Sequence, residues 1–304
     1  MKKIKEYATI KRGDKMNDML LNYFTNDESF PFFIQFGGHD EPLELHGHAD
    51  FSELVVVMDG SADHIVETEH FPVRKGDVFV MGSGIRHGYD NVKGLRICNV
   101  MFRPEALLNG DHDIKQHAGF HALFLLEAEV NRTAGFRSRL RLSHSDFADI
   151  ESLLTMTVKE YSSDSTGKKT MLHACFMQIV VKLSRLYDAP AKQPEISGMA
   201  EAAAFMESHY MEDISIEQVL EISHYSQRHF IRLFSAAYNT TPQKYLMGIR
   251  IRKACSLLRE STLPITEVAM RCGFGDSNYF SRAFRKVSGM TPSQFRSGNG
   301  ISYM

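Results

Sequence analysis

Three kinds of segment are missing from this chain, and each absence excludes a class of protein. No run of about 18 apolar residues occurs, so we expect no membrane-spanning helix. Residues 1–20 carry lysines but no apolar stretch after them, so we expect no signal peptide. The four cysteines form no C-x-x-C pair, which argues against a disulfide framework or a zinc ribbon and for free thiols in a reducing cytoplasm.

A strong net charge is also missing, but the charge is unevenly distributed. The 304 residues carry a formal net charge of −2. Residues 222–304 hold 12 basic and 3 acidic side chains, a local balance of +9. Such an excess fits a polyanionic partner such as nucleic acid, although many solvated helices are basic as well. A hydrophobic content of 43% and this length favour two packed domains.

The pattern of apolar residues divides the chain into four regions. Between residues 30 and 102, short apolar runs alternate with glycine-containing turns, which predicts an antiparallel β-sandwich or barrel. Apolar residues then recur at helical spacing on both sides of 162–168, which predicts an antiparallel helical hairpin. Residues 188–198 have the composition of a linker, and helical periodicity follows. We therefore predict an α+β protein with a barrel over 1–144, a hairpin over 145–187, a linker over 188–198 and an all-helical domain over 199–304.

The helical domain contains the same arrangement twice, at residues 216–238 and 265–287. In the first unit Ser215 is placed to cap a helix, a break follows at 224–225, and Ser226 is placed to cap a second helix. In the second unit the turn falls at 273–275, and we expect Tyr279 or Phe280, together with Phe284 and Val287, to be buried. Each unit is therefore predicted to be a helix-turn-helix. The helical stretch 242–260 would be about 28 Å long, close to the roughly 34 Å between adjacent major-groove segments on one face of DNA.

The segment 251–296 resembles the signature of the AraC/XylS family of bacterial regulators. The family pattern runs from an R-x-x-x-A-x-x-L-L helix through G-F-x-[DS]-x-x-[YF]-F to P-x-x-[YF]-R. The matching residues are Arg250 or Arg252, Ala254, Leu257, Leu258, Ile265, Val268, Ala269, Gly273, Phe274, Asp276, Tyr279, Phe280, Arg282, Phe284, Arg285, Gly289, Pro292, Phe295 and Arg296. In the first unit Asn239 stands near where the family usually has glycine, and asparagine tolerates the left-handed conformation.

The resemblance implies that the second helix of each unit binds double-stranded promoter DNA. In the first unit Arg228 and Arg232 match base-reading positions of the family, and arginine pairs well with guanine in the major groove. Asp276 is expected to cap the second unit's helix, and DNA binding is expected to reside in residues 199–304. The candidate contacts of the second unit are Ser277, Asn278, Ser281, Arg282 and Arg285.

The N-terminal region carries two motifs with cupin spacing. His46 and His48 form an H-x-H pair, Glu53 follows, and His87 lies eleven residues after Gly76. Both histidines of H-x-H lie on one face of a strand, so we expect the four polar side chains to converge in one barrel cavity. The resemblance implies a double-stranded β-helix barrel in which the equivalent residues bind a metal. Three imidazoles and a carboxylate suit zinc, iron, nickel or manganese.

The same segments resemble the sensor domain of sugar-responsive members of the regulator family, especially the rhamnose-operon regulators. In that setting the histidines and Glu53 contact a sugar without a bound metal, because sugar hydroxyls need polar partners inside an apolar barrel. Direct sugar contact, a bound metal and a purely structural role all stay open at this point. The remaining histidines, which we expect to be exposed to solvent, include His112, His117, His121 and His144.

Two functions from different classes fit these motifs. The first is a ligand-responsive transcription regulator, an activator by family habit, with a carbohydrate effector such as rhamnose and RNA polymerase as a partner. We expect a homodimer whose interface is the hairpin, through Leu172, Ile179 and Leu183. The second is a metal-dependent cupin sugar isomerase or dioxygenase. A double helix-turn-helix has no purpose in an enzyme, so we favour a cytoplasmic regulator without catalytic activity.

Overall fold

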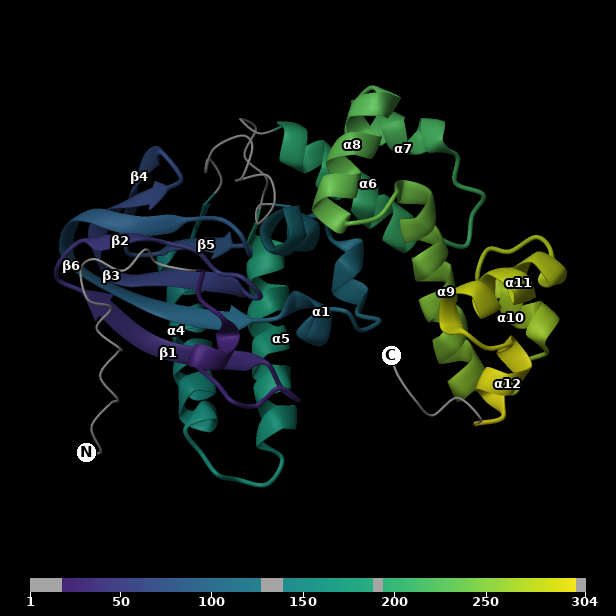
Figure 1. Cartoon of the computed structure of the whole chain (residues 1–304), viewed down its shortest axis with the longest axis horizontal. Coiled ribbons are helices and arrows are strands. Elements are labelled where there is room, and N and C mark those ends of the chain that lie inside the picture. The colour runs from purple at the N-terminus through teal and green to yellow at the C-terminus, as the bar shows by residue number, and fades with distance from the viewer. Residues whose placement is uncertain (1–17, 127–138, 188–193, 299–304) are drawn as a thin grey trace.

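The structure, a computed structural model, describes residues 18–126, 139–187 and 194–298. Figure 1 shows an N-terminal lobe of strands backed by two long helices, and a C-terminal lobe made of helices. The α+β class predicted from the sequence is confirmed. Within the ranges just given, no helix is long and apolar enough to cross a membrane.

The described strands of the N-terminal lobe form one antiparallel sheet of seven strands. The strands are β1 (Phe32–His39), β2 (Leu43–His46), β3 (Ser52–Val66), β4 (Glu69–Arg74), β5 (Asp77–Met81), β6 (His87–Phe102) and β7 (Leu140–Arg141). Their main order is β1-β6-β3-β5-β7, with β2 paired to β6 and β4 to β3. Register shifts between Val57 and Asp63 bend β3, which is how one long strand serves two parts of a curved sheet.

The sheet is buried on both faces, which explains the uninterrupted apolar run at 54–57. Leu54 and Val56 face outward and share an apolar cluster with the long helices, whereas Val55 and Val57 face inward into a second cluster. Successive side chains of a strand point to opposite faces, so both sets must be apolar here. The inward face therefore forms the interior of the cupin-like domain.

The predicted helical hairpin is present as α4 (His144–Tyr161) and α5 (Lys168–Leu186). Ser143 caps α4 by accepting a hydrogen bond from the Asp146 amide. The prediction that Leu172, Ile179 and Leu183 form a dimer interface is wrong, because all three are at most 2% exposed. They pack in the cluster that covers the outer face of the sheet, the nearest large apolar surface.

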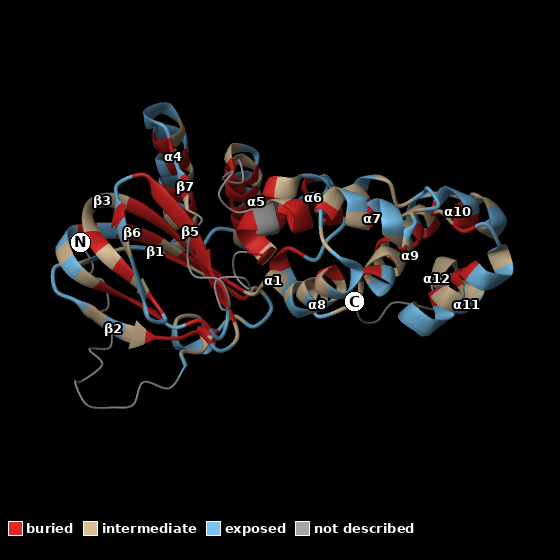
Figure 2. Cartoon of the chain, turned by 90° about the horizontal axis from the view of Figure 1, so that it is seen from above, coloured by how far each residue is buried: buried red, intermediate tan, exposed pale blue. Residues whose placement is uncertain are grey.

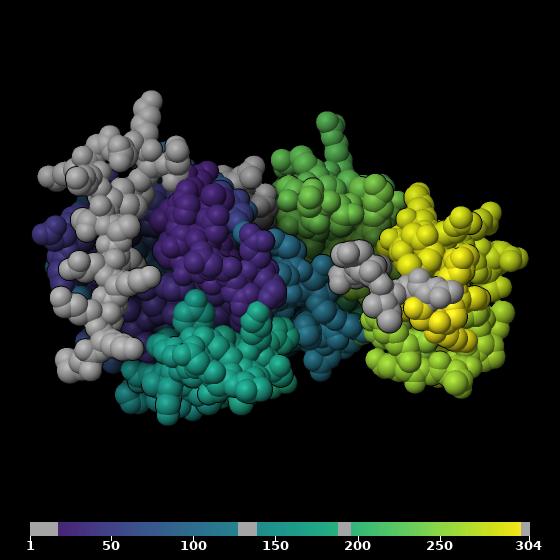
Figure 3. All heavy atoms as spheres, turned by 60° about the horizontal axis from the view of Figure 1, so that its bottom comes forward, coloured from purple at the N-terminus to yellow at the C-terminus, as the bar shows by residue number. Residues whose placement is uncertain are grey.

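Short helices join the two lobes. They are α1 (Pro104–Leu107), η2 (Asp113–Gln116), α2 (Ala118–Phe120) and η3 (His121–Leu126), and the last three pack on α6 (Pro194–Ser208). In Figure 3 this blue segment lies between the two lobes. Residues 194–198 of the predicted linker are helical, since a proline is well tolerated in a first helical turn, and 188–193 lie outside the described residues. His121 is completely buried in this junction, so the expectation that it is solvated is wrong.

The two helix-turn-helix units lie on either side of a long helix. Their helices are α7 (Ile216–Ser223) and α8 (Gln227–Tyr238), then α9 (Pro242–Glu260), α10 (Ile265–Arg271), α11 (Ser277–Ser288) and α12 (Pro292–Arg296). Ser215 caps α7 as predicted, in a capping box with Gln218, and Asn239 ends α8 in the left-handed conformation with φ 50°. The predicted cap by Ser226 is wrong, because its side chain makes no cap hydrogen bond at the start of α8.

The second helix of each unit buries phenylalanines at helical spacing. Phe230 and Phe234 of α8 and Phe280 and Phe284 of α11 are all fully buried. Figure 2 shows buried, red segments beside exposed, pale blue segments along the helical lobe. Val287 is 50% exposed, so its predicted burial is wrong: it occupies the last turn of α11, and only the two phenylalanines reach the core.

Candidate DNA interface and effector site

The first candidate DNA-reading surface lies on α8. Because Phe230 and Phe234 anchor one side of this helix, Arg228 and Arg232 remain exposed on the other side. Within the described ranges, neither guanidinium group is ion-paired. Their donors are therefore available for guanine or for phosphate.

The second candidate surface lies on α11. Asn278, Arg282 and Arg285 are exposed, whereas Ser277 and Ser281 are only partly exposed. The Ser281 hydroxyl donates a hydrogen bond to the Ser277 carbonyl over 2.9 Å. The predicted cap is confirmed, since the Asp276 carboxylate accepts a hydrogen bond from the Asn278 amide over 2.7 Å. The three longer polar side chains of α11 are thus exposed to solvent, whereas both serines lie closer to the helix backbone.

The sequence missed one exposed group on α11. Tyr279 is 48% exposed, although the sequence pattern weighed it as a core residue beside Phe280. Spacing alone cannot decide which of two adjacent aromatic residues is buried, because Tyr279 and Phe280 fit the apolar face of the helix equally well. In the view of Figure 2, α8 and α11 lie toward one edge of the domain, and α7 and α10 toward the opposite edge.

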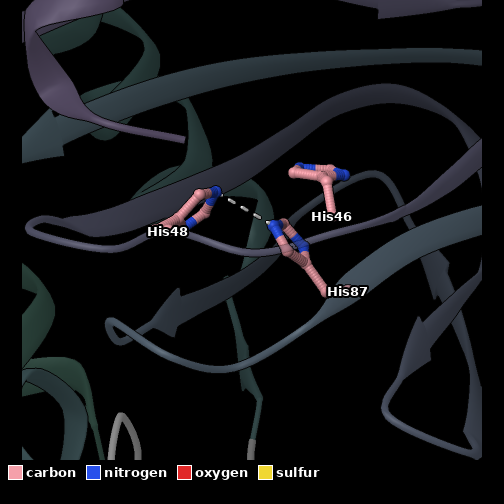
Figure 4. A group of neighbouring side chains, drawn as sticks. All are labelled: His46, His48 and His87. Carbon is pink, nitrogen blue, oxygen red and sulfur yellow. Dashed lines mark hydrogen bonds between the residues drawn. The ribbon is translucent and has the colours of Figure 1, made fainter. Parts of the chain in front are cut away.

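The candidate effector site lies on the inner face of the barrel. His46 ends β2, His48 follows it, Glu53 lies on β3 and His87 begins β6, and all four are at most 5% exposed. Figure 4 shows the three imidazoles converging. His87 Nε2 lies 3.3 Å from both His48 Nε2 and the Glu53 carboxyl, and His48 Nε2 lies 3.7 Å from that carboxyl. The four residues chosen from the sequence are therefore brought together.

Burial controls the charge of this cluster. Desolvation raises the pKa of Glu53 to about 8 and lowers the pKa of His48 to about 3. Desolvation and the neighbouring histidines lower the pKa of His87 well below its ordinary value. Although Glu53 lies at ion-pair distance from both imidazoles, these shifts favour the neutral forms of all three groups near pH 7. The contacts of Glu53 with His48 and His87 are then contacts between neutral groups rather than ion pairs.

The donor set also fits a divalent metal. One nitrogen from each of His46, His48 and His87 lies within 4.8 Å of the others, and Glu53 adds an oxygen beside them. Imidazole and carboxylate ligands suit zinc, iron, nickel and manganese. The geometry is therefore compatible with either of the two ligands considered from the sequence, a metal or a sugar.

The sequence missed His64, which lies on β3 and is fully buried. Its Nε2 lies 3.2 Å from His87 Nδ1, and its ring stacks on Phe79 at 4.5 Å and on Tyr89 at 5.1 Å. Neither cupin motif includes this position, so no spacing rule could find it. Only the pairing of β3 with β6, in which His64 lies opposite Tyr89, brings it beside His87.

Known protein families match both lobes. The AraC-like ligand binding domain family matches residues 33–157, and a helix-turn-helix domain family matches residues 220–298. The chain belongs to the AraC family of transcription regulators. The ligand-binding match contains the whole buried cluster of His46, His48, Glu53 and His87, and the helix-turn-helix match contains α8 and α11.

Similar proteins align with this AraC-family chain over most of its length or over its DNA-binding domain. The HTH-type transcriptional activator RhaR of Mannheimia succiniciproducens is 28% identical over 284 residues, 91% of this chain and 95% of that protein. The HTH-type transcriptional activator RhaS of Klebsiella pneumoniae is 29% identical over 252 residues, 83% of this chain and 87% of that protein. A crystal structure of the DNA-binding domain of AdpA with a target DNA aligns at 30% identity and TM-score 0.32, over 33% of this chain and 90% of that one.

Proposed function

We propose that this AraC-family protein activates carbohydrate-utilisation genes in the cytoplasm when a small sugar binds inside its barrel. The observation that carries the proposal is the buried polar cluster of His46, His48, Glu53 and His87 in an apolar interior. The same chain carries two helices, α8 and α11, whose exposed arginines form no ion pair with the residues that the structure describes. The relatives, which are transcription activators of the Rha group, support this combination of sensor and DNA-binding domain.

The chemistry of the cluster suits a neutral polyol. Neutral imidazole offers one donor and one acceptor, and a protonated Glu53 adds an O–H donor, so together they match hydroxyl groups in both roles. A deoxy-sugar such as rhamnose would also place a methyl group against the apolar wall that includes Phe51, Phe79 and Met81. Sugar recognition needs no catalysis, and we propose that the barrel senses its ligand without converting it.

A metal-dependent sugar isomerase or dioxygenase is the second candidate, because the three imidazoles can converge on one ion. A divalent ion bound there would supply a Lewis acid to a sugar oxygen. Metal analysis of the purified chain, followed by turnover assays of the zinc-, iron-, nickel- and manganese-loaded protein with neutral sugars, separates the candidates. Product formation would favour the enzyme. Bound metal without any product would favour the sensor.

The sensor proposal is tested by DNA binding of the full chain with and without L-rhamnose and other neutral sugars. An activating sugar should change promoter affinity about 5- to 150-fold, the usual range of coupling between sites. His48→Ala and Glu53→Gln should remove this response, while His70→Ala, an exposed histidine on β4, should leave it intact. A full response in both cluster variants would contradict binding at this cluster.

We also propose a homodimer that contacts RNA polymerase once bound to the promoter. Since the inner side of the hairpin is covered, its outer side is the available surface, and Met156 and Met171 are 44% and 51% exposed there. Met156→Lys with Met171→Lys should give monomers in sedimentation. The control is Met270→Lys, on α10, where the methionine is 66% exposed. If the double variant sediments as the wild type does, the dimer interface lies elsewhere.

A further inference from the structure

The inner face of the barrel holds more polar atoms than the histidine cluster explains. Gln35 Nε2, the Tyr89 hydroxyl and Asn99 Oδ1 are buried without a hydrogen-bond partner among the described residues, as is His48 Nδ1 within the cluster. An unpaired buried polar atom destabilises a fold, and native structures hold few of them. Several such atoms on one face therefore point to a ligand that pairs with them.

The strand register places the two amides on the same face as Glu53. Gln35 of β1 lies opposite Asn99 of β6, and Asn99 lies opposite Val55 of β3, whose side chain is part of the inner cluster. Directly opposite residues of an antiparallel pair point to the same side of the sheet. Glu53 lies two residues before Val55 and hence on that side too, at the diagonal distance of roughly 7 Å from Asn99. A monosaccharide bound at the cluster is wide enough to reach the amides.

Tyr89 lies on the inner face beside the histidine cluster. It lies on β6 two residues after His87, is 2% exposed, and its ring packs against His64 at 5.1 Å and His39 at 5.6 Å. The Tyr89 hydroxyl can donate one hydrogen bond and accept others. Tyr89 thus borders the histidine cluster through its contacts with His64 and His87.

We propose that Gln35, Tyr89 and Asn99 form a second half of the effector site and bind the hydroxyl edge of the ligand that faces away from the histidines. This rests on the proposed function, because it takes the barrel to be the effector site. The three residues have donors and acceptors but no charge, so they set specificity for the pattern of hydroxyl groups.

The residues around the two amides also disfavour charged sugars. Two rows cross the inner face around the amides, and neither contains a lysine or an arginine. They are Phe33–Met101–Glu53–Met81 and Gln35–Asn99–Val55–Phe79. Within these two rows a buried carboxylate or phosphate would find no lysine or arginine to compensate its charge, which makes its transfer from water unfavourable. Uronic acids and sugar phosphates should therefore bind far more weakly than the neutral sugars of the same shape.

The test uses isothermal titration and thermal unfolding of the full chain with L-rhamnose, L-fucose, L-arabinose, D-galacturonate and L-rhamnose 1-phosphate. The variants are Tyr89→Phe, Gln35→Leu and Asn99→Leu, which remove the polar atoms and keep an apolar side chain in their place. Each should weaken the tightest neutral sugar about two- to tenfold, the worth of one neutral hydrogen bond. Each should also leave the ligand-free melting temperature unchanged or higher, because an unsatisfied polar atom is gone. Tyr23→Phe and Gln178→Leu make the same changes at exposed positions and should alter neither the sugar affinity nor the ligand-free melting temperature.

The outcomes separate this inference from the function on which it rests. Lower ligand-free melting temperatures in all three variants would show structural hydrogen bonds and overturn the inference, whatever binds. Neutral-sugar binding that His48→Ala abolishes but the three variants leave intact would overturn it while the proposed function stands. Tighter binding of the charged sugars would overturn the exclusion of charge. Binding of no sugar at all would overturn the sugar sensor and the inference together.

Discussion

The two helix-turn-helix units share a sequence pattern but are held in place differently. Phe230 and Phe234 of the first unit belong to one continuous apolar cluster with α6, η3 and the outer face of the sheet. Phe280 and Phe284 of the second unit lie in a separate cluster made with α9 and α10. Only the first unit therefore shares its core with the sensor lobe, and a change in that lobe reaches α8 more directly than α11.

Polar contacts across the junction reinforce this difference. His121 Nε2 donates to the Lys115 carbonyl over 2.6 Å, which leaves Nδ1 as an acceptor for the Tyr238 hydroxyl at 3.0 Å. Burial lowers the pKa of His121 to about 4, consistent with this neutral form. Tyr238 is the last residue of α8, so the bond ties the end of a candidate recognition helix to the sensor lobe. Lys253 on α9 also pairs with Asp111 over 2.7 Å.

The largest expected contrast comes from emptying each core. Phe234→Ala and Phe284→Ala should each cost about 3–5 kcal/mol of unfolding free energy, because each removes a fully buried ring. Hydrogen exchange should then rise in α6 and η3 as well as α8 for Phe234→Ala, but only in α9 to α12 for Phe284→Ala. Equal exchange patterns in the two variants would mean that the cores are coupled and that the comparison fails.

The next contrast concerns DNA contacts. Arg228→Ala and Arg232→Ala should each cost roughly 1–3 kcal/mol on the promoter site and little on random DNA, if these arginines read bases. Arg282→Ala supplies the same change on the second unit. Promoter and random DNA are compared by fluorescence anisotropy at several salt concentrations. Losses of equal size on both DNAs would reassign the residue to phosphate contact, with a shallower salt dependence.

A smaller effect is expected from the bond between the lobes. Tyr238→Phe removes one hydrogen bond worth about 0.5–1.5 kcal/mol and should change the ratio of promoter affinities with and without effector. Tyr279→Phe makes the same change on α11, where the tyrosine is exposed, and should leave that ratio as it is in the wild type. An unchanged ratio for Tyr238→Phe would show that the bond plays no part in the response.

The smallest effect should come from the ion pair at the junction. Asp111→Asn breaks the ion pair with Lys253. The Asp111 side chain is 29% exposed and the Lys253 side chain 21% exposed, so the loss should lower stability by about 1 kcal/mol or less. Asp149→Asn breaks the more exposed pair with Lys182 and should cost still less in thermal unfolding. A larger loss of stability for Asp149→Asn than for Asp111→Asn would contradict the expectation that the junction ion pair is the stronger of the two.

The shared core also changes how the DNA-binding region should be handled. The sequence suggests that residues 199–304 bind DNA alone, but α6 begins at Pro194 and its Met199 and Ala203 lie in the cluster shared with the sensor lobe. A fragment that starts at 199 would lack the first turn of α6 and expose that apolar surface. The full chain is therefore the better material for every measurement above.

Local pattern by itself determined the elements and most of the candidate residues. Helical spacing of phenylalanines, the caps Ser215 and Asp276, and the H-x-H pair act within a few residues, so the sequence is enough to predict them. Tertiary structure alone decided that Leu172 faces the sheet, that His121 is buried and that His64, Gln35 and Asn99 share a face with Glu53. Those outcomes depend on strand register and on which apolar surface a helix finds, and both join residues far apart in the chain.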